Sequence, residues 1–253
     1  MSGTFGGDLH NDNTLKMKSA SLPVVRPRWV HDSSAAFECL VRRRGRERGA
    51  NAFNVNINGA LTASVACSAE ELRAAAALVQ VRYAERGYRV SGAAGNEPDS
   101  SVTLIARQSD VIVGTLTVKF DGPQGLGADE SYGDAVDAVR RAGGDVCELT
   151  RLAVEPSVDS RSVLSVLFGL AYVVGRRVRG VTDVFVEVNP RHVAFYRRLF
   201  GFGTAAGRRI CPRVMAPAVL LRLEIERLEA MLADSGILTR SALGPNAGLA
   251  LAA

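Results

Sequence analysis

Two charged residues interrupt the apolar segment "VCELTRLAV" at residues 146–154. Central strands of a sheet are usually continuous apolar runs, and an unpaired charge inside one is strongly destabilising. Glu148 and Arg151 are therefore expected to be paired or to act on a ligand. A carboxylate in such a place can serve as a general base, and a guanidinium can hold an anionic group by two parallel hydrogen bonds.

The spacing of these two residues limits how they can cooperate. Residues three apart in a regular strand point to opposite faces of the sheet. Glu148 and Arg151 can share one pocket only if a β-bulge turns one of the side chains. The alternative is structural, with Glu148 paired to Arg151 or to another buried arginine.

Composition and charge bound the class of protein. The chain has 253 residues, 47% of them hydrophobic, which suffices for one sizeable domain with tails. Lys and Arg number 31 against 26 Asp and Glu, so the net charge of +5 favours an anionic partner. That balance does not choose between nucleic acid, phosphate groups and an acidic protein.

The sequence predicts a cytoplasmic protein with no transmembrane segment. No apolar run approaches the ~20 residues of a membrane span, and "MSGTFGGDLHNDN" lacks the basic and apolar regions of a signal peptide.

The cysteines are far apart and have no metal-ligand spacing, so no metal site is expected. They are Cys39, Cys67, Cys147 and Cys211.

Three regions are expected along the chain. Residues 1–50 lack periodicity and contain "RRRGRERG", which predicts a flexible basic N-terminal arm. A nucleic-acid contact by this arm is less favoured, because no aromatic residues are interleaved for base stacking. The folded domain is expected at residues 51–235, followed by a C-terminal tail at 236–253.

The elements that must position the charged strand can be placed by periodicity and capping. Ser68 and Glu71 form a capping box before a helix that ends near Gly87. Asp159 or Ser160 caps a second, largely apolar helix. The remaining expected elements are strands within 51–67, a hairpin at 101–121, a loop with a short helix at 122–143, a strand at 181–189, a helix at 190–202, strands at 208–215 and 218–225, and a helix at 226–236.

This order of elements and the segment "VFVEVNPRHVAFYRRLFGF" resemble the GNAT acyltransferase superfamily. The resemblance implies an α/β fold: a GNAT-like mixed, mostly antiparallel twisted sheet with a splayed central strand, flanked by helices. It also implies a β-bulge in that central strand, a feature that the regular two-residue period of a strand does not predict.

Within the superfamily, "CELTRLAVEP" resembles the Glu-x-x-Arg strand of autoinducer synthases. Together with "GADESYGDAVDAVRRAGGDV" and "CPRVMAPAVLL", it is most similar to FeeM-type N-acyl amino acid synthases. This resemblance implies a bacterial enzyme that moves a long fatty acyl chain from acyl carrier protein to the α-amine of an amino acid. No permanently bound cofactor is implied.

The resemblance also suggests roles for residues of the predicted site. Glu148 would deprotonate the amine, Arg151 would orient the acceptor carboxylate or brace Glu148, and Thr150 would contact the acceptor. Tyr196 would donate a proton to the departing sulfur, or it is a core aromatic residue. Asn189 would contact the pantetheine arm, or it only begins the next helix.

The donor is inferred from the start of the long helix. The segment "SVDSRSVLS" at 157–165 has no glycine, whereas acetyl-CoA users of the superfamily usually carry a Gly-rich loop there. This favours acyl-phosphopantetheine on a carrier protein over acyl-CoA, with Ser160, Arg161 and Ser162 as candidate phosphate contacts; the alternative is simple capping. The basic surface expected to meet the acidic carrier protein includes Arg176, Arg177, Arg191, Arg197 and Arg198.

Three other functions stay open. One is an acyl-homoserine lactone synthase, although "VRYAERGYRV" lacks the expected tryptophan and the one tryptophan, Trp29, lies in the arm. Another is a CoA-dependent acyltransferase with a different acceptor. The third is a non-catalytic module of this fold that binds nucleic acid through its basic arm.

Overall fold

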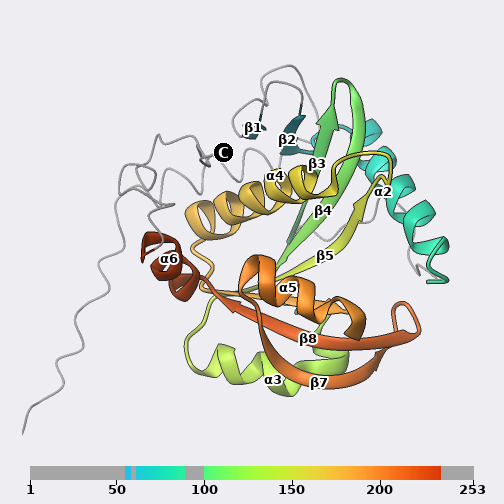
Figure 1. The fold of residues 1–253 in the computed structure, drawn as a ribbon. Coiled ribbons are helices and arrows are strands. Elements are labelled where there is room, and N and C mark those ends of the chain that lie inside the picture. Colours follow the sequence, from blue (N-terminus) through green and yellow to red (C-terminus); the bar gives the residue numbers. More distant parts are fainter. Residues whose placement is uncertain (1–54, 58–60, 89–99, 235–253) are drawn as a thin grey trace, which may run out of the picture.

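The structure, a computed structural model, describes residues 55–57, 61–88 and 100–234. These residues form one eight-stranded sheet in the order β1-β2-β3-β4-β5-β6-β8-β7 (Figure 1). All neighbouring strands are antiparallel except β5 and β6, which are parallel. This mixed sheet confirms the expected fold. The predicted arm at 1–50 and tail at 236–253 lie outside the described residues.

The elements follow the order expected from the sequence. The strands are β1 (Val55–Ile57), β2 (Leu61–Val65), β3 (Ser101–Gln108), β4 (Val111–Phe120), β5 (Val146–Val154), β6 (Asp183–Val188), β7 (Gly203–Cys211) and β8 (Ala216–Glu224). The helices are α2 (Ala69–Ala84), α3 (Asp129–Arg141), α4 (Ser160–Tyr172) with its π-helical continuation η1 (Val173–Val178), the short η2 (Pro190–His192), α5 (Val193–Phe200) and α6 (Ile225–Asp234).

Helices cover both faces of the sheet. On one face α4 lies directly on the strands, since a Cβ at Gly114 of β4 would overlap Val163 and lie 3.2 Å from Leu167 of α4. On the other face α2 packs on β3, and Tyr132 of α3 packs with Phe185 of β6. Figure 1 shows α4 across the upper strands and α3 beneath β7 and β8. The sheet is therefore the wall between two helical layers.

The central strands separate part-way along their length. β5 pairs with β6 only from Val146↔Asp183 to Leu149↔Val186. Beyond Leu149, β5 stays paired with β4, while β6 stays paired with β8. The expected splayed central strand is confirmed.

The expected β-bulge lies just beyond this separation. Thr117 pairs with Thr150 and Thr115 with Ala153, so two residues of β5 face one residue of β4. The first of these two, Arg151, has φ of +54°, a left-handed conformation that strands do not normally contain. This distortion breaks the strict alternation of side chains along β5.

The first helix begins as its sequence predicts. The backbone N–H of Glu71 donates to Ser68 Oγ at 3.0 Å, and the N–H of Ser68 donates back to Glu71 Oε2 at 2.9 Å. This confirms the capping box. Gly87 takes φ of +74° three residues beyond the last residue of α2, where a residue with a side chain would be strained.

Two boundaries differ from the sequence prediction. The loop with a short helix contains a 13-residue helix, α3, because Tyr132, Val136 and Val139 recur on one buried face. The strand expected at 208–215 begins earlier, at Gly203, and ends at Cys211. Residues 212–215 form the turn to β8, in which Met215 has φ of +51°.

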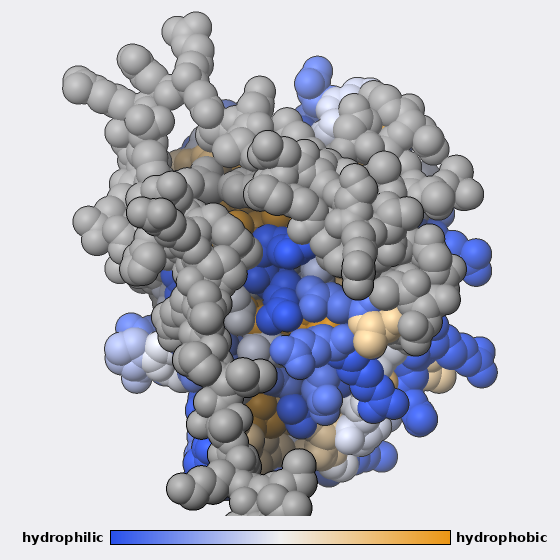
Figure 2. All heavy atoms as spheres, turned by 90° about the vertical axis from the view of Figure 1, so that its left-hand side faces the viewer, coloured by the Kyte–Doolittle hydropathy of each residue, from blue (hydrophilic) through white to orange (hydrophobic). Residues whose placement is uncertain are grey.

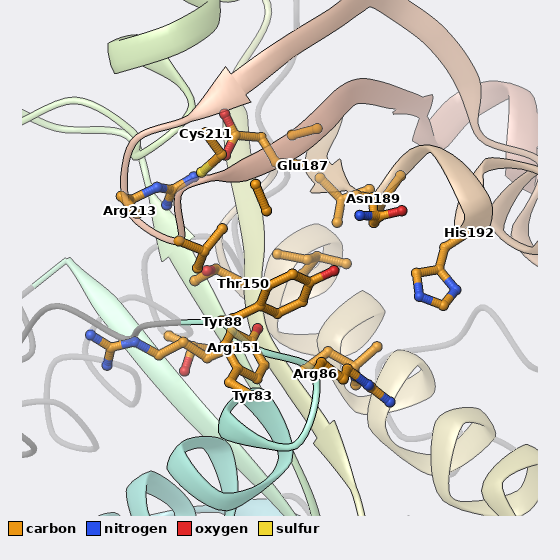
Figure 3. A pocket seen from close by; sticks show the side chains of 18 of the residues that line it. Tyr83, Arg86, Tyr88, Thr150, Arg151, Glu187, Asn189, His192, Cys211 and Arg213 are labelled. Carbon is orange, nitrogen blue, oxygen red and sulfur yellow. The ribbon is translucent and has the colours of Figure 1, made fainter.

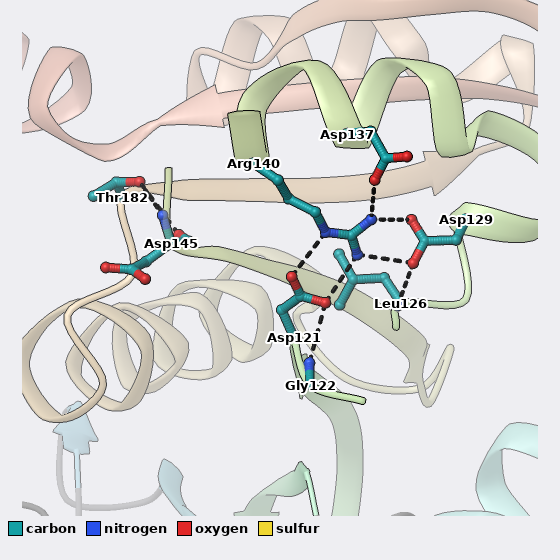
Figure 4. Close-up of polar contacts among 8 residues, drawn as sticks. All are labelled: Asp121, Gly122, Leu126, Asp129, Asp137, Arg140, Asp145 and Thr182. Atoms are coloured by element: carbon teal, nitrogen blue, oxygen red, sulfur yellow. Dashed lines mark hydrogen bonds and ion pairs between the residues drawn. The ribbon is translucent and has the colours of Figure 1, made fainter. Parts of the chain in front are cut away.

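An arginine-centred cluster fixes the loop that leads into α3 (Figure 4). Arg140 donates to Asp121 at the end of β4 at 2.8 Å and to Asp129 at the start of α3 at 2.8 Å. Asp129 also accepts a hydrogen bond from the backbone N–H of Leu126 at 2.7 Å. The loop between β4 and α3 is thereby held at both ends.

The last helix that the structure describes, α6, packs beside the end of α4. Tyr172 donates to Glu229 of α6 at 2.6 Å, and Arg176 pairs with the same carboxylate at 3.1 Å. Burial and the Glu229 carboxylate raise the pKa of Tyr172 to about 12.

Figure 2 views the side of the molecule on which α6 lies and shows mainly hydrophilic side chains over its uncovered centre. Among the described residues, none of the helices has the length and apolar character needed to cross a bilayer.

Candidate active site

A pocket of about 730 Å³ opens where β5 and β6 separate (Figure 3). Its walls come from β5, β6, the end of α2, the start of α5 and the turn between β7 and β8. Of the predicted site residues, the pocket is lined by Glu148, Thr150, Arg151, Ser160, Asn189 and Tyr196. Arg161 and Ser162 are outside its lining.

Glu148 is buried at the pocket wall with both carboxylate oxygens occupied. Its side chain is only 1% exposed. Oε2 accepts from the backbone N–H of Ala128 at 3.0 Å, and Oε1 accepts from Arg213 at 3.1 Å. Glu148 therefore pairs with an arginine beside the pocket, and this arginine, Arg213, is 33% exposed.

Arg213 joins Glu148 to a second buried carboxylate, Glu187 of β6. Arg213 donates to Glu187 Oε2, which also accepts from the thiol of Cys211 at 3.1 Å. Burial opposes the charge of Arg213, but Glu148 and Glu187 outweigh it and raise the pKa of the guanidinium. The side chain of Glu187 is 6% exposed, and its Oε1 has no hydrogen-bond partner.

Gly127 allows Arg213 to reach this position. A Cβ at Gly127 would overlap the guanidinium of Arg213 and lie 3.0 Å from Glu148 Oε2. The neighbouring residue, Ala128, supplies the N–H that Glu148 accepts. The loop before α3 therefore contributes both space and a hydrogen bond to the cluster formed by Glu148, Arg213 and Glu187.

The β-bulge brings Arg151 into the same pocket as Glu148. The two side chains lie apart within it, because Glu148 binds Arg213 while Arg151 lies near Tyr83 of α2 (Figure 3). Thr150 lies between Glu148 and the bulge and also lines the pocket. The basic side chain is therefore placed to bind a separate part of a ligand.

Tyr196 lines the pocket and also belongs to the core. Its ring makes edge contacts with Phe168, Phe195 and Phe202 at centroid distances of 6.3, 5.5 and 5.7 Å. Burial is the main reason why the pKa of its hydroxyl is raised. The hydroxyl therefore stays protonated at neutral pH, as a proton donor must.

The start of α4 already holds an anionic group. Asp159 caps the helix, accepting from the N–H of Arg161 at 3.1 Å and from the hydroxyl of Ser162 at 2.6 Å. Those hydrogen bonds lower the pKa of Asp159. Any phosphate that binds here must displace the Asp159 carboxylate.

Asn189 and His192 line the opposite side of the pocket from Arg213 (Figure 3). Asn189 caps η2, with its side-chain oxygen accepting from the N–H of Arg191 at 3.2 Å. Burial, together with Arg191 and Arg86, lowers the pKa of His192, so the imidazole is neutral at neutral pH.

The residues proposed as a basic surface fall into two groups. Arg191, Arg197 and Arg198 are exposed around α5. Arg176 is instead engaged with Glu229 of α6.

Within the described residues, no cluster of three or more His, Cys, Asp or Glu side chains could hold a metal ion.

Sequence reasoning did not single out Glu187, Arg213 or Cys211. Glu187 interrupts the apolar strand "VFVEV" in the way that Glu148 interrupts "VCELT". That repeated anomaly could have revealed it. The strand pattern gives no such signal for Arg213 and Cys211, although both stand in "CPRVMAPAVLL", one of the segments that carry the resemblance to FeeM-type synthases.

The comparisons with known proteins identify a family. The family model described as "N-acyl amino acid synthase FeeM" matches residues 74–224. The solved structure of FeeM, an N-acyl amino acid synthase from uncultured soil microbes, has a TM-score of 0.63 at 24% identity, covering 69% of this chain and 98% of that chain. No curated protein sequence matches significantly.

Two further solved structures are less similar. A putative N-acetyltransferase from Lactobacillus plantarum has a TM-score of 0.47 at 18% identity, covering 65% of this chain and 98% of its own. An acyl-CoA N-acyltransferase from Pseudomonas aeruginosa has a TM-score of 0.46 at 16% identity, covering 64% and 98%. The family model spans more than half of the sequence, so the chain belongs to the FeeM family of N-acyl amino acid synthases and is an acyltransferase.

Proposed function

We propose that the protein transfers a long fatty acyl group from the phosphopantetheine of acyl carrier protein to the α-amine of an amino acid. The observation that carries this proposal is the position of the pocket. It opens where β5 and β6 part and is lined by residues from both helical layers, so a donor and an acceptor can meet within it. Buried carboxylates lie at the meeting point.

The lining residues suit an amino acid acceptor. Only the neutral form of the amine attacks a thioester, so the ammonium must first lose a proton. Glu148, the base indicated by the sequence, and Glu187 form the proposed proton-accepting site. Arg151 is proposed to bind the acceptor carboxylate, with Thr150 as a further contact.

The proposed acyl transfer uses groups near the separated strands. Beyond Leu149 the backbone of β5 no longer pairs with β6, so an N–H there can stabilise the oxyanion of the tetrahedral intermediate. Tyr196 is proposed to protonate the departing sulfur and Asn189 to contact the pantetheine arm. Apolar lining side chains, among them Leu152, Leu164 and Val188, suit the start of a fatty chain.

The start of α4 supports a donor with a single phosphodiester. Asp159 caps this helix, and its carboxylate repels a pyrophosphate more strongly than a phosphodiester, which carries less negative charge. Ser160, Arg161 and Ser162 remain the proposed phosphate contacts, with Asp159 turning away when the donor binds. The exposed Arg191, Arg197 and Arg198 are proposed to meet an acidic carrier protein.

Expression in a bacterial host, followed by mass spectrometry of the lipid extract, tests the proposed function. We expect fatty acids linked through an amide to an amino acid, absent from cells that carry an empty vector. Arg151→Ala should reduce them strongly, whereas Arg141→Ala on α3, outside the pocket, should not. If no amino acid conjugate accumulates although the protein is folded and abundant, the proposed acceptor is wrong.

A further inference from the structure

One oxygen of the buried Glu187 carboxylate has no partner. Oε2 accepts from Arg213 and Cys211, whereas Oε1 accepts no hydrogen bond. The side chain is only 6% exposed, so bulk water does not replace the missing donor. Leaving a buried acceptor unsatisfied is destabilising. Such a position in a pocket indicates that a ligand or a bound water supplies the missing donor.

Glu187 lies at the place where the two halves of the sheet divide. Val186 makes the last pair with β5, and Glu187 is the next residue along β6. It pairs with Leu220 of β8, which packs under α3 together with Phe185. The carboxylate therefore lies on the α3 side of the sheet, next to the point where β5 and β6 separate and beside Cys211 and Arg213 (Figure 3).

Most charges around this pocket cannot hold an ammonium group. The charged side chains that line it are five basic ones and two carboxylates, within the part of the chain that the structure describes. They are Arg82, Arg86, Lys119, Arg151, Arg213, Glu148 and Glu187. Both oxygens of Glu148 already accept hydrogen bonds, so Glu187 Oε1 is the carboxylate oxygen left for an ammonium.

The groups that face Glu187 preserve its acceptor character. Arg213 from the β7–β8 turn is shared with Glu148 of β5, so two carboxylates face one guanidinium. Burial, and next the Glu187 carboxylate itself, raise the pKa of Tyr132 on α3 and of Cys211 on β7. Both groups are therefore neutral at neutral pH, so neither adds a charge beside Glu187, and Arg213 is the cation that its two carboxylates share.

We propose that Glu187 Oε1 binds the acceptor ammonium and takes its proton, directly or through one water, while Glu148 positions Arg213. This inference rests on the proposed N-acyl transfer. One ammonium proton passes to Glu187, and the freed lone pair forms the C–N bond with the thioester carbon. As the C–S bond breaks, a second nitrogen proton reaches the sulfur through the Tyr196 hydroxyl. The proton on Glu187 leaves to solvent with the product.

Steady-state kinetics of Glu187→Gln and Glu148→Gln between pH 6 and 9 test this assignment. At pH 7 the kcat/KM of Glu187→Gln for the amino acid should fall about 100-fold, the size typical of a lost general base. The deficit should shrink by about tenfold per pH unit, because more of the acceptor is deprotonated before it binds. Glu148→Gln removes the negative charge that pairs with Arg213. Its loss of kcat/KM should therefore not depend on pH, and its melting temperature should be lower than that of the wild type.

Hydroxylamine, which is largely neutral at pH 7, provides the matched acceptor. With it, Glu187→Gln should approach the wild-type rate. The assignment would be overturned if Glu187→Gln lost the same fraction of kcat/KM with both acceptors at every pH. It would also be overturned if this variant were as active as the wild type with the amino acid at pH 7. If Glu187→Gln does not fold, Glu187→Asp should lose about tenfold at pH 7 and recover with hydroxylamine; equal losses with both acceptors would overturn it. Failure of the wild-type protein to acylate any amine would contradict the proposed function itself.

Discussion

Two arginine-centred clusters contact the loop before α3, and their carboxylates differ in exposure. Arg140 pairs with Asp121, Asp129 and Asp137 at 2.7–2.8 Å, and these carboxylates are 31%, 26% and 51% exposed (Figure 4). Arg213 pairs with Glu148 and Glu187, which are 1% and 6% exposed (Figure 3). Both clusters hold more carboxylates than arginines.

Burial makes the difference between the two clusters. Around Arg140, water can solvate whatever the guanidinium leaves unpaired, so the excess negative charge has little consequence. In the other cluster the side chain of Arg213 is 33% exposed, but its two carboxylates have almost no access to water, and one oxygen of Glu187 is unsatisfied. Similar side chains therefore brace a loop in one place and form the wall of a reactive pocket in the other.

The largest expected effect is the loss of Arg213. Arg213→Met would leave two buried carboxylates without a cation, and breaking a buried pair in this way costs about 3–5 kcal/mol. Urea denaturation should show this loss in the free energy of unfolding, and acyl transfer should be abolished. A loss no greater than that of Arg140→Met would show that burial does not separate the two clusters.

A smaller effect is expected at Gly127. Gly127→Ala places a methyl group against the guanidinium of Arg213 and near Glu148, so the arginine must move away. Overpacking of this kind costs about 1–3 kcal/mol, and kcat/KM should fall with it. The matched control is Gly133→Ala in α3, where a Cβ meets nothing within 4 Å. If the two variants have equal stability and activity, the close approach at Gly127 has no role.

The smallest effects are expected in the cluster around Arg140. Arg140→Met should lower the free energy of unfolding by about 1 kcal/mol, since the partners remain hydrated. Asp137→Asn, which removes the most exposed partner, should change it by about 0.3 kcal/mol. Thermal denaturation measures both changes. A loss above 3 kcal/mol for Arg140→Met would mean that this cluster behaves as a buried one.

Much of the fold could be predicted because its signals are local. The capping box at Ser68, the helix cap at Asp159 and the strand that contains "VFVEV" depend on neighbouring residues and are observed as expected, although that strand is buried along nearly its whole length. The bulge at Arg151 could not be derived from periodicity, and it was expected only from the resemblance to GNAT enzymes.

The partners of Glu148 could not be predicted, because they are distant in sequence. Arg213 is 65 residues away in a turn, and Ala128 is 20 residues away in a loop. Each reaches Glu148 only through tertiary packing, for which a single sequence has no periodic signal. The pairing of Asp159 with Ser162 was equally hidden, because a phosphate contact and a helix cap use the same residue types.

The most direct test is acyl transfer by the purified protein, with fatty acyl carrier protein as the donor and single amino acids as acceptors. Mass spectrometry of the product, together with a count of thiol groups released, should show one N-acyl amino acid for each thiol. Release of thiol without an amide for every amino acid offered would contradict the assignment of the pocket as a site of N-acylation.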